Sequence, residues 1–245
     1  MIKAIKELIV HKEEYFFYLL FLAIAGISSA VLLNMFLEIT EGFQRGELIH
    51  FDQKVTAYLH AYRTENLTTM VIAVTEMGSQ WAYMIVIPII AYLLYQKGHS
   101  WGRTWQATLI LISTFLLNMG IKHLISRPRP LEESRLVEVA DASFSYPSGH
   151  SMSAIAFYGF IIYLTFKYVD KNWLKYSLIF LQVMLILGIG LSRIYLGVHY
   201  PTDVAAGFIA GLIWLFICIV ALRSVKFYRQ QKEKRKYRTG KRITD

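Results

Sequence analysis

Three short polar motifs stand out in an otherwise apolar chain of 245 residues. They are Lys122-x6-Arg129-Pro130, Pro147-Ser148-Gly149-His150 and Ser192-Arg193-x5-His199-x3-Asp203. Together they supply two histidines, one carboxylate and three fixed cations. An arginine guanidinium pairs with two phosphate oxygens at once, and lysine acts as a compact point charge. This combination is suited to binding a phosphoryl group and breaking the bond that joins it to the rest of a substrate.

The third motif has the most specific chemistry. Asp203 follows His199 by about one helical turn, which brings the two side chains within reach of each other. A carboxylate bonded to one ring nitrogen fixes the tautomer and leaves the other nitrogen free to attack phosphorus. Arg193 lies near the end of an apolar span, where a charged side chain usually faces the protein interior and has a partner. That partner is either a phosphate or, alternatively, Asp203 in an internal salt bridge.

The first motif combines two cations with a rigid backbone. Prolines on both sides of Arg129 prevent a helix from continuing and hold the segment extended. For Lys122, the alternative is a simple positive charge at the end of a span. Arg127 and His123 fall outside the motif, so we expect them at the surface or in supporting positions.

The second motif predicts a helix start. Ser148 is a favourable N-cap, and the free N–H groups of a helix N-terminus bind anions. Gly149 lets the backbone approach an oxyanion closely. Simple capping is the alternative for both residues, but it leaves His150 unexplained.

The composition is that of a membrane protein. Hydrophobic residues make up 55% of the chain, and the mean hydropathy is +0.40. The net charge of +9 is concentrated in residues 223–242, which contain ten Lys or Arg against one Glu. A basic segment beside an apolar span indicates a cytoplasmic end and attraction to anionic headgroups, so we predict no nucleic-acid partner. No cluster has metal-ligand spacing, which predicts chemistry without a metal or other cofactor.

Six apolar stretches are long enough to cross about 30 Å of hydrocarbon as helices. They run approximately Tyr15–Leu37, Met70–Tyr95, Thr104–Ile121, Ser148–Tyr168, Leu174–Leu196 and Pro201–Leu222. Polar residues interrupt the start of the second stretch, and we expect the polar segment 38–69 at the membrane surface. The sequence therefore predicts an all-α, six-transmembrane-helix bundle as a single domain over residues 1–222. A basic cytoplasmic tail at 223–245 follows it.

The distribution of positive charge predicts the orientation. Lysines before the first span, cations after spans two and four, and the basic tail all fall on one side, which is therefore cytoplasmic. Both termini then lie in the cytoplasm of a multi-pass plasma-membrane protein. The three motifs fall on the opposite, extracytoplasmic face, which predicts one shared site.

On all three motifs, in this order and with these spacings between residues 122 and 203, the chain resembles the type-2 phosphatidic acid phosphatases. The resemblance implies that His199 is the nucleophile and that Asp203 orients it. It also implies that His150 protonates the leaving oxygen and later activates water. The groups implied to hold the phosphoryl oxygens are Lys122, Arg129, Ser148, the Gly149 amide and Arg193.

The expected function is metal-independent hydrolysis of a lipid phosphate or diphosphate ester through a phosphohistidine. Bacterial members of the family with this size resemble phosphatidylglycerophosphate and undecaprenyl-diphosphate phosphatases, and phosphatidic acid is a further candidate substrate. The main alternative is a lipid phosphotransferase that uses the same site. Another is a lipid-phosphate binder or transporter without turnover. Vanadium haloperoxidases share the motif pattern, but they are soluble and the six spans argue against one.

Overall fold

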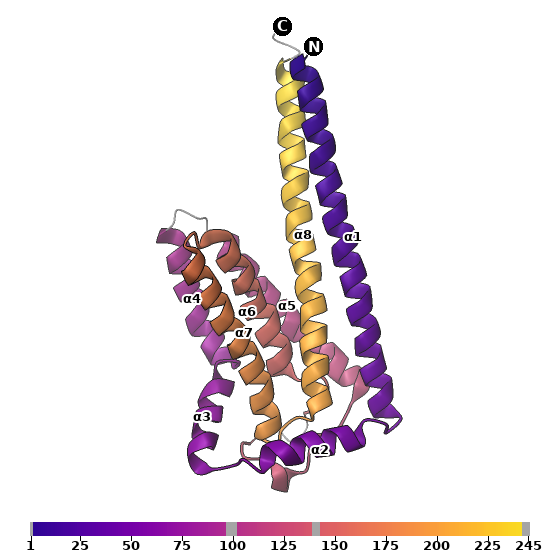
Figure 1. The fold of residues 1–245 in the computed structure, drawn as a ribbon, viewed down its shortest axis with the longest axis vertical. Coiled ribbons are helices and arrows are strands. Elements are labelled where there is room, and N and C mark those ends of the chain that lie inside the picture. The colour runs from indigo at the N-terminus through magenta and orange to yellow at the C-terminus, as the bar shows by residue number, and fades with distance from the viewer. Residues whose placement is uncertain (1, 97–101, 139–142, 242–245) are drawn as a thin grey trace. The chain divides into compact units, whose positions relative to one another are not determined.

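The computed structural model describes residues 2–96, 102–138 and 143–241. Over these ranges the chain forms helices and no β-strand. Figure 1 labels the α-helices. In chain order the helices are α1 (Ile2–Gln44), α2 (Ile49–His60), α3 (Glu65–Glu76), α4 (Gln80–Gln96), α5 (Gly102–Ile125), the short 3-10 helix η1 (Glu132–Ser134), α6 (Gly149–Tyr168), α7 (Asn172–Tyr195) and α8 (Pro201–Lys241).

The chain divides into two compact units, the first of which comprises Met1–Leu32 and Phe216–Asp245. In this unit the terminal parts of α1 and α8 lie side by side (Figure 1). The Tyr18 ring stacks on Phe227 with the ring centroids 4.3 Å apart, and its hydroxyl donates to Ser224 Oγ at 2.7 Å. A stacked aromatic pair and a hydrogen bond therefore join the two helices.

The second unit comprises Leu33–Leu215 and contains all three motifs. Its core lies around α6, which packs against both α5 and α7. Met152 and Phe160 of α6 are fully buried. Gly207 and Gly211 of α8 face the same helix, because an added Cβ at either position would collide with α6 atoms. Small residues at this spacing let two helices approach closely.

Within the residues that the structure describes, five helices are long and apolar enough to cross a membrane, namely α1, α5, α6, α7 and α8. A sixth span results if α3 and the first part of α4 count together, although they meet at a bend of 56°. The bend follows Glu76, where the sequence predicted an interruption of the second span. The six-span topology with cytoplasmic termini stays a prediction. Beyond the predicted end of the sixth span at Leu222, α8 continues as a helix to Lys241.

Candidate active site

A cavity of about 740 Å³ lies within the second unit. Six of the eight predicted site residues line it, namely Lys122, Arg129, Gly149, His150, Arg193 and His199. They come from α5 and the loop after it, from α6, and from α7 and the loop after it. The tertiary structure therefore gathers side chains from all three motifs around one space.

The other two predicted site residues, Ser148 and Asp203, are fully buried and do not line the cavity. The Ser148 hydroxyl caps α6 and accepts a hydrogen bond from Ser151 Oγ at 2.9 Å. Its observed contacts are therefore those of the capping alternative, because the hydroxyl points into the protein. Asp203 lies in the first turn of α8, beside His199.

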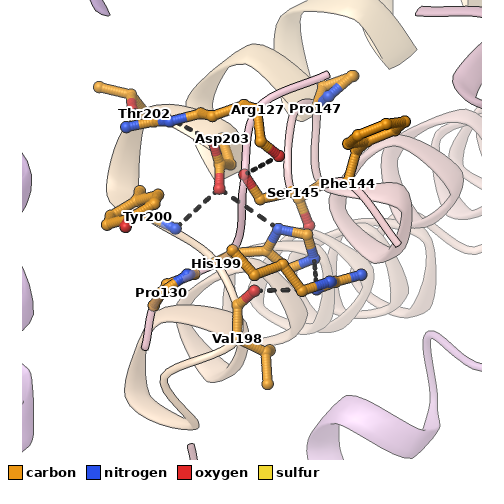
Figure 2. A network of polar contacts seen from close by, with 12 residues as sticks. Arg127, Pro130, Phe144, Ser145, Pro147, Val198, His199, Tyr200, Thr202 and Asp203 are labelled. Atoms are coloured by element: carbon orange, nitrogen blue, oxygen red, sulfur yellow. Dashed lines mark hydrogen bonds and ion pairs between the residues drawn. The ribbon is translucent and has the colours of Figure 1, made fainter. Parts of the chain in front are cut away.

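His199 has one ring nitrogen toward a carboxylate and the other toward a cation. Its Nδ1 lies 3.5 Å from Asp203 Oδ2 (Figure 2). Its Nε2 lies 3.3 Å from Arg129 Nη1. A guanidinium can only donate, so Nε2 is the acceptor and the ring proton is on Nδ1, toward Asp203. The 3.5 Å spacing is longer than an ordinary hydrogen bond, as is common in enzymes without bound substrate.

The protonation state of His199 follows from its surroundings. Burial lowers the pKa of His199 well below its usual value of 6.5. Nearby cations lower that pKa further, and these are Arg129, Arg193 and Lys122. The imidazole is therefore neutral at physiological pH, which is the form in which Nε2 has a lone pair for attack.

A tight turn at the end of α7 places His199 beside Arg193. Gly197 has a φ of +74°, a left-handed conformation that glycine adopts without strain. The turn lets the Val198 and His199 N–H groups both donate to the Arg193 carbonyl, at 3.2 and 3.3 Å. An added Cβ at Gly197 would also collide with the Ser134 carbonyl. This turn therefore fixes the spacing between Arg193 and His199.

Arg193 is 6% exposed and faces the cavity. Its Nη1 donates to Thr75 Oγ1 at 2.9 Å, which ties the guanidinium to α3. Among the residues that the structure describes, Arg193 Nε has no hydrogen-bond partner. The alternative salt bridge between Arg193 and Asp203 is not formed, because Arg127 pairs with Asp203 instead. A buried, partly unpaired guanidinium on a cavity wall is suited to bind an anion.

The loop before α6 fixes the remaining cations. Arg129 Nε donates to Ser143 Oγ at 2.8 Å, and its Nη1 donates to the Val198 carbonyl at 2.9 Å. Lys122 Nζ donates to the Phe144 carbonyl. Backbone and hydroxyl oxygens hold these side chains, and neither forms an ion pair with a carboxylate in the described part of the chain. Both side chains line the cavity.

Two further residues, which the sequence did not predict as site residues, contact Asp203 and the start of α8. Arg127, expected at the surface or in a supporting position, has a 10% exposed side chain that bridges Asp203 and Asp52. Its place beside Arg129 in an Arg-Pro-Arg-Pro run was the available signal. Asp52 belongs to no motif, so no sequence signal could have identified it. It reaches the start of α8 only because tertiary packing brings α2 there. His123 is exposed, in agreement with the expectation for it.

No group of three or more His, Cys, Asp or Glu within the described ranges could hold a metal ion. Independence from metals and cofactors stays a prediction.

Apolar helices over the described ranges, with two histidines and three cations around one cavity, have the parts expected of an integral-membrane phosphatase. Residues 103–226 match the PAP2 superfamily, and the chain belongs to that family. It is 32% identical to phosphatidylglycerophosphatase B of Bacillus subtilis, over 74% of this chain and 87% of that protein. It is 24% identical to an undecaprenyl-diphosphatase of Sulfolobus acidocaldarius, over 86% of this chain and 93% of that protein.

Among solved structures, the fold is similar to a transmembrane PAP2-type phosphatidylglycerolphosphate phosphatase from Bacillus subtilis. The TM-score is 0.74 at 27% identity, over 81% of this chain and 97% of that chain.

Proposed function

We propose that the protein hydrolyses a phosphate ester of a membrane lipid through a phosphohistidine formed on His199. One observation carries the proposal. The neutral Nε2 of His199 lies on the same cavity wall as Arg129, and that cavity is also lined by His150 and Arg193. A nucleophile, a second titratable group and fixed cations around one space are the parts that phosphoryl transfer needs.

In the proposed reaction, the Nε2 lone pair forms a bond to phosphorus while the bond from phosphorus to the lipid oxygen breaks. His150 gives its proton to that leaving oxygen. Asp203 stabilises the positive charge that the His199 ring gains, and the cations stabilise the phosphoryl oxygens. Water then attacks phosphorus, its proton passes to His150, and the N–P bond breaks to release inorganic phosphate.

The walls of the cavity support a lipid as the substrate. Trp81, Ile112 and Phe115 line the cavity and are 65%, 52% and 61% exposed. Trp81 belongs to α4, and the other two belong to α5, a candidate membrane span. An apolar rim of this kind lets acyl or isoprenyl tails stay in the bilayer while the headgroup reaches the cations.

The names of the relatives indicate which lipids to test. Phosphatidylglycerophosphate and undecaprenyl diphosphate are the leading candidates, and phosphatidic acid is the third. The charge distribution along the sequence supports an extracytoplasmic site in the plasma membrane, where each of these headgroups can be reached from the outer leaflet.

The test is phosphate release by the purified protein from these three lipids in detergent micelles. We expect release from at least one lipid, and we expect His199→Ala to abolish it while the melting temperature stays near that of the wild type. Transfer of the phosphoryl group to another lipid, with no free phosphate, would assign a phosphotransferase instead. Lipid binding without turnover would assign a binder, and full activity of His199→Ala would exclude the phosphohistidine.

A further inference from the structure

Arg127 joins two buried carboxylates. Its Nη1 donates to Asp203 Oδ1 at 2.6 Å, and its Nη2 donates to Asp52 Oδ2 at 2.8 Å. Figure 2 shows Arg127 beside Asp203, on the side away from His199. The two carboxylate oxygens of Asp203 therefore have different partners. Oδ1 faces Arg127, and Oδ2 faces His199 Nδ1.

Aromatic rings hold the Arg127 guanidinium from two directions. It lies 4.5 Å from the Phe43 ring centroid and 4.2 Å from the Tyr200 ring centroid. Both distances are within the range of a cation–π contact. Together with two carboxylates, these rings leave the guanidinium little freedom to turn.

Asp52 is 2% exposed and anchors the network from α2. Its Oδ1 accepts from the Thr202 N–H at 2.9 Å, and its Oδ2 accepts from Thr202 Oγ1 at 2.8 Å. These bonds place a negative charge at the N-terminus of α8, where a helix stabilises an anion. The same turn of α8 carries Asp203, so Asp52 fixes both the turn and the cation that holds Asp203.

We propose that Asp52 and Arg127 are positioning residues for phosphoryl transfer, which hold Asp203 so that its second oxygen faces His199. This proposal rests on the function proposed above. The charges alternate from Asp52 through Arg127 to Asp203, and the His199 ring becomes the fourth member when it gains positive charge on bonding to phosphorus. Without Asp52, Arg127 has Asp203 as its only carboxylate partner among the described residues, so more of the Asp203 charge is used by Arg127 and less stabilises the ring.

Charged and titratable groups surround His199 and its carboxylate from every neighbouring element. They are Asp52 of α2, Lys122 of α5, Arg127 and Arg129 of the following loop, Tyr146 of the same loop, His150 of α6, Arg193 of α7, Tyr200 of the loop after α7 and Asp203 of α8. Against this background, Asp52→Asn adds one net positive charge and therefore lowers the pKa of His199 further. A purely structural role of Asp52 would not produce that change.

The test compares the wild type with Asp52→Asn, Arg127→Lys and a control, Glu41→Gln. The control removes a carboxylate from an exposed arginine pair, in which Glu41 lies 3.0 Å from Arg45 with the two side chains 60% and 65% exposed. The measurements are kcat and KM with the most active lipid, the pH dependence of kcat/KM, and the melting temperature. The wild type and His199→Ala are assayed first, so that failure of the proposed function is seen separately.

We expect Asp52→Asn to lower kcat by roughly 10- to 100-fold, the range commonly seen when the hydrogen-bond partner behind a metal ligand is removed. KM should stay unchanged, and the acid limb of the pH profile should move to lower pH. Arg127→Lys should lose part of kcat, because an ammonium lacks the planar fork that bridges two carboxylates. Glu41→Gln should match the wild type.

A folded Asp52→Asn protein with wild-type kcat would overturn the proposal. The proposal would also be overturned if the loss of activity matched the fraction of unfolded protein while the acid limb of the pH profile did not move. If this variant does not fold, Arg127→Ala is assayed at low temperature with added guanidinium. Recovery of kcat would support the positioning role, whereas folded protein without recovery would overturn it.

Discussion

Arg193 offers the sharpest single test of how the cavity binds a phosphoryl group. Its guanidinium has five N–H donors, and Nη1 already donates to Thr75. Nε has no partner within the described part of the chain, so the edge formed by Nε and Nη2 can fork onto two phosphoryl oxygens. Each hydrogen bond to a charged group contributes about 1.5–3 kcal/mol. Two such bonds give about 3–6 kcal/mol, or a loss of kcat/KM for Arg193→Ala of roughly 200- to 20,000-fold.

The assay is phosphate release from the most active lipid, with melting temperatures to confirm folding. Arg193→Lys should have an intermediate kcat/KM, because it keeps the charge and loses the fork. Arg45→Ala is the matched control, since that guanidinium is 65% exposed and pairs with Glu41 on the helix surface. If folded Arg193→Ala turned over lipid as the wild type does, the assignment of Arg193 as a phosphoryl ligand would be refuted.

Three further predictions concern packing, pH and metals. Gly78→Ala should destabilise the folded protein by about 1–3 kcal/mol, and so lower both the melting temperature and the activity. The reason is that the new Cβ would lie 2.7 Å from Ile189 Cγ2 and 3.2 Å from His150 Cδ2. Gly120→Ala should leave both unchanged, since no atom lies within 4 Å of its added Cβ. A harmless Gly78→Ala would contradict the observed close packing. His199 stays neutral in the folded protein, whereas in the unfolded chain its imidazole takes up a proton once the pH is below its usual pKa of 6.5. The free energy of unfolding should therefore fall as the pH drops below 6.5. Relative to the wild type, His199→Asn should flatten this dependence by up to about 1.4 kcal/mol per pH unit, and equal slopes would argue against a buried neutral ring. Phosphate release should persist in EDTA, and a loss on chelation that Mg²⁺ reverses would show that the metal-free prediction is wrong.

Several features of the fold could be predicted from local sequence. The apolar stretches indicated the membrane helices, and the polar residues around Gly78 indicated the interruption that separates α3 from α4. The prolines beside Arg129 predicted the end of α5, which the structure places at Ile125. These features depend on composition and spacing within a few turns, so a single sequence contains them.

The order and spacing of the three motifs also predicted which residues would gather. Six of the predicted residues line one cavity, although they come from different helices and loops. Their individual roles in phosphoryl transfer stay predictions. Family-specific spacing indicated the chemistry here, whereas hydropathy indicated only the membrane.

Only the tertiary structure decided which side chains pair. Asp203 could have paired with Arg193 of the same motif, but the loop after α5 gives it Arg127 instead. Packing of α2 against the start of α8 then brings in Asp52. Likewise, Ser148 lies behind the cavity wall, because the α6 cap points its hydroxyl into the protein. The sequence by itself indicated the apolar helices and most of the residues that gather around the cavity. The partners of each charge depend on distances between segments remote in the chain, and local periodicity carries no information about those distances.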